Sequence, residues 1–123
     1  MIETRTVDVV QPDVCYAGGL TRALRVAALA VGAGLPCTPH SANHSLVLVF
    51  TLHLVSAIEN AGPYVEFSIE PDDEYPWQVG MFEPRPEVVD GMVDMPTGPG
   101  WGVEIAAEWL SRAEYEISTL ADS

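Results

Sequence analysis

The chain contains no lysine, and its positive charge rests on five arginines among 123 residues. Its eighteen carboxylates give a formal net charge of −13. This charge would repel a polyanion such as DNA or RNA, and five arginines offer few phosphate contacts. The composition therefore argues against nucleic acid as a partner.

Long apolar runs and cysteine are also scarce. The longest apolar run, residues 46–58, is interrupted by three polar side chains and is too short to cross a bilayer. The N-terminus lacks the basic and apolar stretches of a signal peptide. The two cysteines have no metal-ligand spacing, so reduced thiols are expected. These features predict a cytoplasmic protein without a membrane partner.

Short apolar runs alternate with helix-like stretches up to residue 70. The runs predict three strands, at residues 7–11, 35–38 and 64–69. Apolar spacing predicts two helices, one at 20–32 and one running from a cap at Asn43 or Ser45 to about Ile58. Because strands joined by helical crossovers pair in parallel, this order predicts an α/β fold with about three parallel strands.

The composition of the sequence changes after Glu70. Residues 71–86 and 96–102 should be irregular, the former packed by Tyr75, Trp77 and Phe82. Asp90 and Gly91 lie between short apolar pairs, which predicts a β-hairpin, and a last helix is expected at about 106–117. We therefore divide the chain into residues 1–70 and an extension, 71–123.

Three chemically useful residues each follow or close an expected strand: Asp13, His40 and Glu66. Because parallel strands end at one edge of a sheet, we expect these side chains to lie close together. An imidazole beside carboxylates suits proton transfer. The residues alone leave non-catalytic interpretations open, in which Asp13 is a turn residue, His40 a loop residue and Glu66 a surface residue.

Other singled-out residues favour structural roles. His40 and His44 have helical metal-ligand spacing, but the glutamate of the zinc-protease motif is missing and Pro39 favours a loop. His53 is expected in the core and Trp101 as a packing anchor. Gly18 and Gly19 could bind an anion, although a helix entry is the commoner use of such a pair.

Four segments in order, VDVVQPDVCYAGGLTRALRVAALA, TPHSAN, YVEFSIE and PGWGVEI, resemble the C-terminal part of the mandelate racemase and muconate lactonizing family of the enolase superfamily. The resemblance covers nearly the whole chain. It implies a C-terminal fragment of a (β/α)7β TIM-like barrel, with residues 7–11, 35–38 and 64–66 as its sixth to eighth strands. The chain would then begin inside the barrel, so a truncated gene, a miscalled start or a fragment is expected.

The resemblance also implies a chemistry. Such enzymes abstract a proton next to a carboxylate, and Mg²⁺ held by carboxylates on the third to fifth strands stabilises the enediolate. Those strands, and the second strand that carries a catalytic lysine in many members, have no counterpart here. The match assigns the base to His40, the carboxylate that orients it to Asp13, and an acid that binds the substrate carboxylate or enediolate to Glu66.

Two classes of function follow. The chain is part of a Mg²⁺-dependent dehydratase, racemase or epimerase for a sugar acid or related carboxylate, or it is a non-catalytic remnant or a piece that works only when completed by another chain. For the isolated chain we expect no metal ligands, no cofactor and no activity. We also expect self-association, because the outer strands would lack partners.

Overall fold

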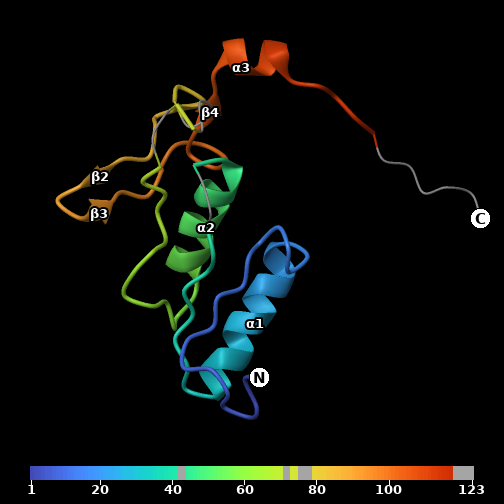
Figure 1. The fold of residues 1–123 in the computed structure, drawn as a ribbon, viewed down its shortest axis with the longest axis vertical. Helices are drawn as coiled ribbons and strands as arrows, with labels where there is room; N and C mark the ends of the chain where they lie inside the picture. The colour runs from blue at the N-terminus through green and yellow to red at the C-terminus, as the bar shows by residue number, and fades with distance from the viewer. Residues whose placement is uncertain (42–43, 71–72, 75–78, 118–123) are drawn as a thin grey trace, which may run out of the picture.

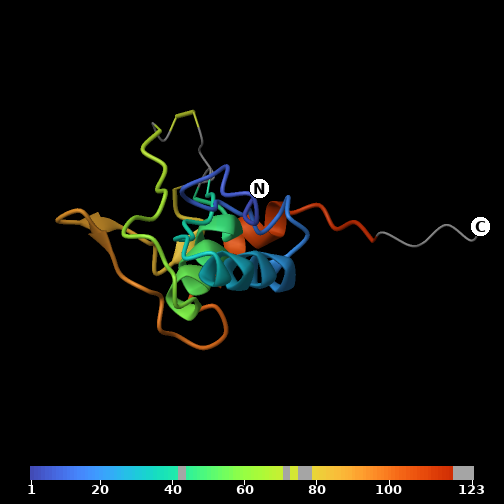
Figure 2. The ribbon, with the colours of Figure 1, turned by 90° about the horizontal axis from the view of Figure 1, so that it is seen from below.

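The computed structural model describes residues 1–41, 44–70, 73–74 and 79–117. It has an α/β fold with few strands, in which helices α1 (Leu20–Gly32) and α2 (Leu46–Ala57) lie side by side (Figures 1 and 2). The other elements are β1 (Phe82–Glu83), β2 (Val88–Val89), β3 (Met92–Val93), β4 (Glu104–Ile105) and α3 (Ala107–Arg112). Within the described residues, no helix is long and apolar enough to span a membrane.

Helix α1 forms where the sequence predicts it. Gly19 occupies the N-cap with φ of 93°, a conformation that glycine adopts without strain, so the glycine pair is a helix entry. At the other end Gly34 has φ of 68°, and the Leu35 N–H donates to the carbonyl of Ala30 at 2.9 Å. This glycine-based stop matches the expected end of the helix.

Helix α2 is capped as expected by Ser45, whose hydroxyl accepts a hydrogen bond from the Val47 N–H at 3.3 Å. Asn43, the other candidate cap, lies outside the described residues. The helix is apolar on nearly every face and largely buried. Its Leu54 packs with Val14 and Ala23 in the core, which therefore lies between the two helices and the segment that precedes α1.

Three segments run in parallel beside the helices. Single bridges join them at Val10 and Cys37, at Asp13 and His40, and at Cys37 and Ala61. Segment 35–38 is therefore the middle one, as expected. Its Cys37 N–H donates to one neighbour, at Asn60, and its Thr38 N–H to the other, at Val10.

The expected continuous strands at 7–11, 35–38 and 64–69 are not formed, and the third segment pairs at Ala61 instead of within 64–69. Proline explains where the ladders stop. In the observed registers Pro12, Pro39 and Pro63 face one another, and none of them has an N–H to donate. The pairing is therefore interrupted at this level in all three segments, and among the described residues it resumes beyond the prolines between Asp13 and His40.

The hairpin is confirmed, and a second antiparallel pair was not predicted. Asp90 and Gly91 have φ of 52° and 77°, as a tight hairpin turn between β2 and β3 requires. Strand β1 pairs with β4, so Phe82, expected in an irregular segment, is a strand residue and is buried. Tyr75 and Trp77 lie outside the described residues.

Helix α3 is shorter than expected. It spans Ala107–Arg112, and Ala113 is already extended with ψ of 135°, whereas the sequence predicted a helix over 106–117. None of its residues is buried, and it lies apart from α1 and α2 (Figure 1). Because so short a helix is marginal without tertiary packing, its amphipathic pattern does not extend it.

The loop containing Trp101 is fastened to α2. The Trp101 ring lies 4.6 Å from that of Phe50 and 5.2 Å from that of His53, measured between centroids. His53 Nε2 donates a 2.8 Å hydrogen bond to the Trp101 carbonyl. Trp101 is thus the expected anchor, whereas His53 is a half-buried linking residue and the core assignment was wrong.

Candidate functional site

Asp13 and His40 meet at one end of two adjacent parallel segments. Their residues form a parallel bridge, and Asp13 Oδ2 lies 2.8 Å from His40 Nδ1. The Asp13 side chain is only 12% exposed, so water competes little for this contact. The expected proximity of the two residues is confirmed, while the chemical roles expected for them stay predictions.

Backbone N–H groups of neighbouring residues orient the Asp13 carboxylate. Its Oδ1 accepts hydrogen bonds from the N–H groups of Cys15 at 2.6 Å and Tyr16 at 2.9 Å, which leaves Oδ2 for His40. Burial raises the pKa of Asp13, but hydrogen bonds from His40, Tyr16 and Cys15 outweigh burial and bring the pKa below its usual value. The carboxylate is therefore ionised and aimed before any ligand arrives.

His40 is held through both its ring and its backbone. Its N–H donates to the Pro12 carbonyl at 3.2 Å, beside the ring contact to Asp13. The hydrogen bond to Asp13 raises the pKa of His40 against the opposing effect of burial, and the charge of Glu66 raises it further. The imidazole thus holds a proton more strongly than a free histidine.

Glu66 approaches the other nitrogen of the ring. Its Oε2 lies 3.7 Å from His40 Nε2 and accepts a 2.9 Å hydrogen bond from the Ser41 N–H. All three predicted site residues are therefore gathered. The Ser41 amide is a positioning group that the sequence analysis missed, because a backbone N–H carries no side-chain signal.

The arrangement suits proton transfer at His40 Nε2. The His40 side chain is 40% exposed, so a substrate can reach it. When Nδ1 donates to Asp13, the neutral imidazole presents Nε2 as a base, and this tautomer follows from Asp13 being an acceptor. A carboxylate that holds one nitrogen while the other exchanges a proton is the arrangement that general acid–base catalysis uses.

The described residues do not fit a magnesium site. Among them no group of three or more His, Cys, Asp or Glu side chains converges as metal ligands. Both oxygens of Asp13 already accept hydrogen bonds, and Glu66 Oε2 is taken by Ser41. Hard cations need several converging oxygens, which these residues do not supply.

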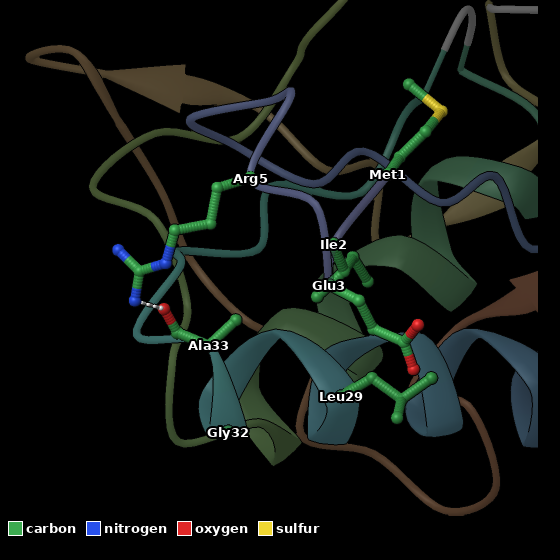
Figure 3. Close-up of a pocket in the computed structure, with 7 residues that line it drawn as sticks. All are labelled: Met1, Ile2, Glu3, Arg5, Leu29, Gly32 and Ala33. Atoms are coloured by element: carbon green, nitrogen blue, oxygen red, sulfur yellow. Dashed lines mark hydrogen bonds between the residues drawn. The ribbon is translucent and has the colours of Figure 1, made fainter.

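A surface hollow lies at the opposite end of α1 from the site. Its lining includes Met1, Leu29 and Arg5, and Arg5 donates a 2.7 Å hydrogen bond to the carbonyl of Ala33, just beyond the helix (Figure 3). Asp13 precedes the start of α1, whereas Ala33 follows its end. This hollow is therefore separate from the His40 site.

Comparison with known proteins gives the family. The family described as "Enolase C-terminal domain-like" matches residues 1–109. The chain belongs to this family. The resemblance to the C-terminal part of an enolase-superfamily member is thereby confirmed.

Individual proteins of the family are considerably longer. L-rhamnonate dehydratase from Saccharopolyspora erythraea is 31% identical over 120 residues, which are 94% of this chain and 29% of that protein. A solved structure from Roseobacter denitrificans, provisionally named a racemase, is 56% identical with a TM-score of 0.88 and covers 98% of this chain and 33% of its own. The chain thus spans about a third of the length of such relatives.

A more distant structure shares the fold. The enolase from Pantoea ananatis, solved with D-gluconate and magnesium, is 22% identical with a TM-score of 0.73, covering 94% of this chain and 27% of its own. Magnesium and a sugar acid are therefore ligands of that protein.

Proposed function

We propose that this chain is the C-terminal part of an enolase-superfamily enzyme that abstracts a proton α to a carboxylate, of the acid-sugar dehydratase or racemase/epimerase type. The observation that carries the proposal is the 2.8 Å contact between Asp13 Oδ2 and His40 Nδ1 at the ends of parallel segments. The dehydratase and racemase names of its relatives support the reaction class.

The chain's own residues would perform one proton transfer. Asp13 keeps the Nδ1–H in place, and His40 Nε2 takes the proton from the carbon next to the substrate carboxylate. The C–H electron pair moves into the carboxylate as an N–H bond forms, which gives an enediolate. Glu66 would be the acid that hydrogen-bonds the substrate carboxylate or that enediolate.

The same proposal covers the division of the chain, its metal, its location and the behaviour of the isolated chain. Residues 1–70 would be a partial barrel, from the sixth to the eighth βα unit, and 71–123 an extension. Magnesium would serve the completed enzyme, with ligands from outside the described residues. Two free cysteines favour the cytoplasm. The isolated chain would be inactive and would self-associate.

A chimaera tests the proposal. The first two thirds of the Roseobacter protein would be fused to this chain, and exchange of the α-proton into D2O would be followed by NMR across a sugar-acid library with magnesium. His40→Asn should lower the exchange rate by about 10²–10⁴-fold, the usual contribution of a general base. His53→Asn, a histidine that bonds Trp101 instead, is the matched control and should change the rate less than threefold. A His40→Asn chimaera that keeps its rate would refute the assigned role.

We keep a second candidate function because the chain spans about a third of the length of its relatives. It could be a non-catalytic remnant, or a piece that functions only when another chain completes it. The first is favoured if the chimaera folds, as judged by dispersed NMR spectra, but exchanges no α-proton of any substrate. The second is favoured if the separate halves, mixed as purified proteins, recover exchange that neither half shows alone.

A further inference from the structure

The peptide group between His40 and Ser41 is held at both of its polar ends. Its carbonyl, which belongs to His40, accepts a hydrogen bond from the Thr51 hydroxyl at 3.4 Å. Its N–H, which belongs to Ser41, donates to Glu66 Oε2 at 2.9 Å. Because a peptide group is planar and rigid, a donor that holds the carbonyl also fixes the direction of the N–H. One peptide group therefore links the Thr51 hydroxyl to the Glu66 carboxylate.

Thr51 is a fully buried polar residue in the apolar helix α2. A buried hydroxyl costs free energy unless it is hydrogen-bonded, and a helical threonine commonly bonds a carbonyl three or four residues earlier. This hydroxyl reaches a carbonyl eleven residues earlier, outside the helix. A valine would satisfy the apolar surroundings without a hydroxyl, so packing alone does not account for a threonine at this position.

Glu66 depends on the N–H that this peptide group presents. Its side chain is 45% exposed, so water competes for its oxygens, and it lies in a segment without regular strand structure. The hydrogen bond from Ser41 holds Glu66 Oε2 at 3.7 Å from His40 Nε2. Any rotation of the peptide group would therefore move the carboxylate relative to the imidazole.

We propose that Thr51 is a positioning residue of the His40 site, whose hydroxyl holds the peptide group so that the Ser41 N–H keeps Glu66 facing His40 Nε2. Linked hydrogen bonds polarise one another, so the donor on the carbonyl also strengthens the N–H as a donor. The consequence for catalysis rests on the proposed function, in which Glu66 binds the substrate carboxylate or the enediolate. The contacts themselves do not depend on it.

Thr51→Val removes the hydroxyl and keeps the branched shape of the side chain, and NMR of the full chain measures the effect. Hydrogen exchange of the Ser41 amide should become about fivefold faster, because its bond to Glu66 weakens. The Cys37 amide, which is bonded within the parallel segments, should change by less than about twofold. The pKa of His40 should fall, because the charge of Glu66 helps to raise it.

Two matched variants separate the hydroxyl from the packing of α2. Thr51→Ser keeps the hydroxyl and should restore both the exchange rate of the Ser41 amide and the pKa of His40. Ser56→Ala removes another hydroxyl of α2, one that bonds the carbonyl of His53 in the same helix, and should alter neither.

Glu66→Gln tests whether Thr51 acts through Glu66. Glutamine lacks the charge that raises the pKa of His40, so this pKa should fall, and adding Thr51→Val should lower it no further. In the chimaera, Thr51→Val should slow α-proton exchange by about 10–100-fold, since a displacement of about 1 Å at a site costs about this much.

Two results would overturn the inference. Equal acceleration of the Ser41 and Cys37 amides in Thr51→Val would show that Thr51 only stabilises the fold. A fall in the pKa of His40 that is as large in the Glu66→Gln background as in the wild type would show that Thr51 does not act through Glu66. An inactive chimaera would count against the proposed function alone, because the NMR measurements on the chain itself decide the role of Thr51.

Discussion

Replacing Asp13 with asparagine would preserve the shape of the side chain and remove its charge. The new carbonyl can still accept the N–H groups of Cys15 and Tyr16, but its amide would face His40 Nδ1. An amide donates, so Nδ1 would have to accept and the ring would carry its proton on Nε2. The base proposed for catalysis would then be in the wrong tautomer.

The change should lower the pKa of His40, because the hydrogen bond to Asp13 is the largest cause of its elevation. Glu66, 3.7 Å from Nε2, would still raise it somewhat. The two hydrogen bonds that Asp13 accepts from the N–H groups of Cys15 and Tyr16 would become neutral ones, each weaker by about 1 kcal/mol, so the free energy of unfolding should fall by about 2 kcal/mol. In the chimaera, α-proton exchange should fall by about 10²-fold or more.

The sign of the pH dependence follows from the two pKa shifts. The stabilisation from His40, whose pKa is raised, is fully present below its unfolded value of about 6.5 and is lost as the pH rises through the folded pKa. That from Asp13, whose pKa is lowered, is present above its unfolded value of about 3.9 and is lost as the pH falls through the folded pKa. The stability difference between wild type and Asp13→Asn should therefore be largest between about pH 4 and 6.5.

NMR titration of the imidazoles measures the pKa, with His53 as an internal control, and urea unfolding at pH 5.5 and 8.5 measures the stability. An unchanged pKa of His40 in Asp13→Asn would show that the contact does not control the ring. A stability difference that grows from pH 5.5 to pH 8.5 would contradict the linkage argument.

Three further outcomes are expected. Asn60→Ala should lower the free energy of unfolding by about 1–3 kcal/mol, because the Asn60 amide donates to the carbonyls of Ala27 and Leu35 at 3.2 and 2.9 Å; urea denaturation measures this, and no loss would contradict it. Ser45→Ala should cost about 0.5–2 kcal/mol through the lost cap of α2, with Ser45→Asp as a control that keeps an acceptor and most of the stability. Calorimetry of the isolated chain should detect no micromolar magnesium binding, and a stoichiometric site would show that the ligand set has been misjudged.

The parts of the fold predicted from sequence carry local signals. Ser45 before an apolar run gave the start of α2, and Asp90 with Gly91 gave the hairpin, because caps and tight turns depend on a few adjacent residues. The meeting of Asp13 and His40 was also predicted, since parallel segments joined by a helix end at the same edge.

The parts that were missed depend on distant partners. Strands β1 and β4 have two residues each, too few for an alternating pattern, and Phe82 pairs with Ile105 far along the chain. The shift of the third pairing to Ala61 depends on Pro39 facing Pro63, which can be read only once the register is known. At Gly62 an added Cβ would lie 2.0 Å from Thr38 Oγ1, so this close approach also needs the partner segment.

The role of His53 was also missed because it depends on a distant partner. An apolar stretch around a histidine predicts burial, but its ring bonds a carbonyl 48 residues later, on a loop whose path the sequence did not reveal. The catalytic roles proposed for the three site residues likewise depend on geometry around a substrate, which no local pattern contains.

The buried position of Cys37 makes its thiol a reporter of how often the three parallel segments separate. Cys37 is fully buried where both outer segments bridge to the middle one, and burial raises the pKa of its thiol, whereas Cys15 is exposed. A thiol reagent should therefore modify the chain in two phases, Cys15 at once and Cys37 only when the parallel segments separate. In a Cys15→Ser background, the rate of the single remaining phase would report how often the parallel segments separate. Binding of a completing polypeptide could then be detected by how far it slows the reaction of Cys37.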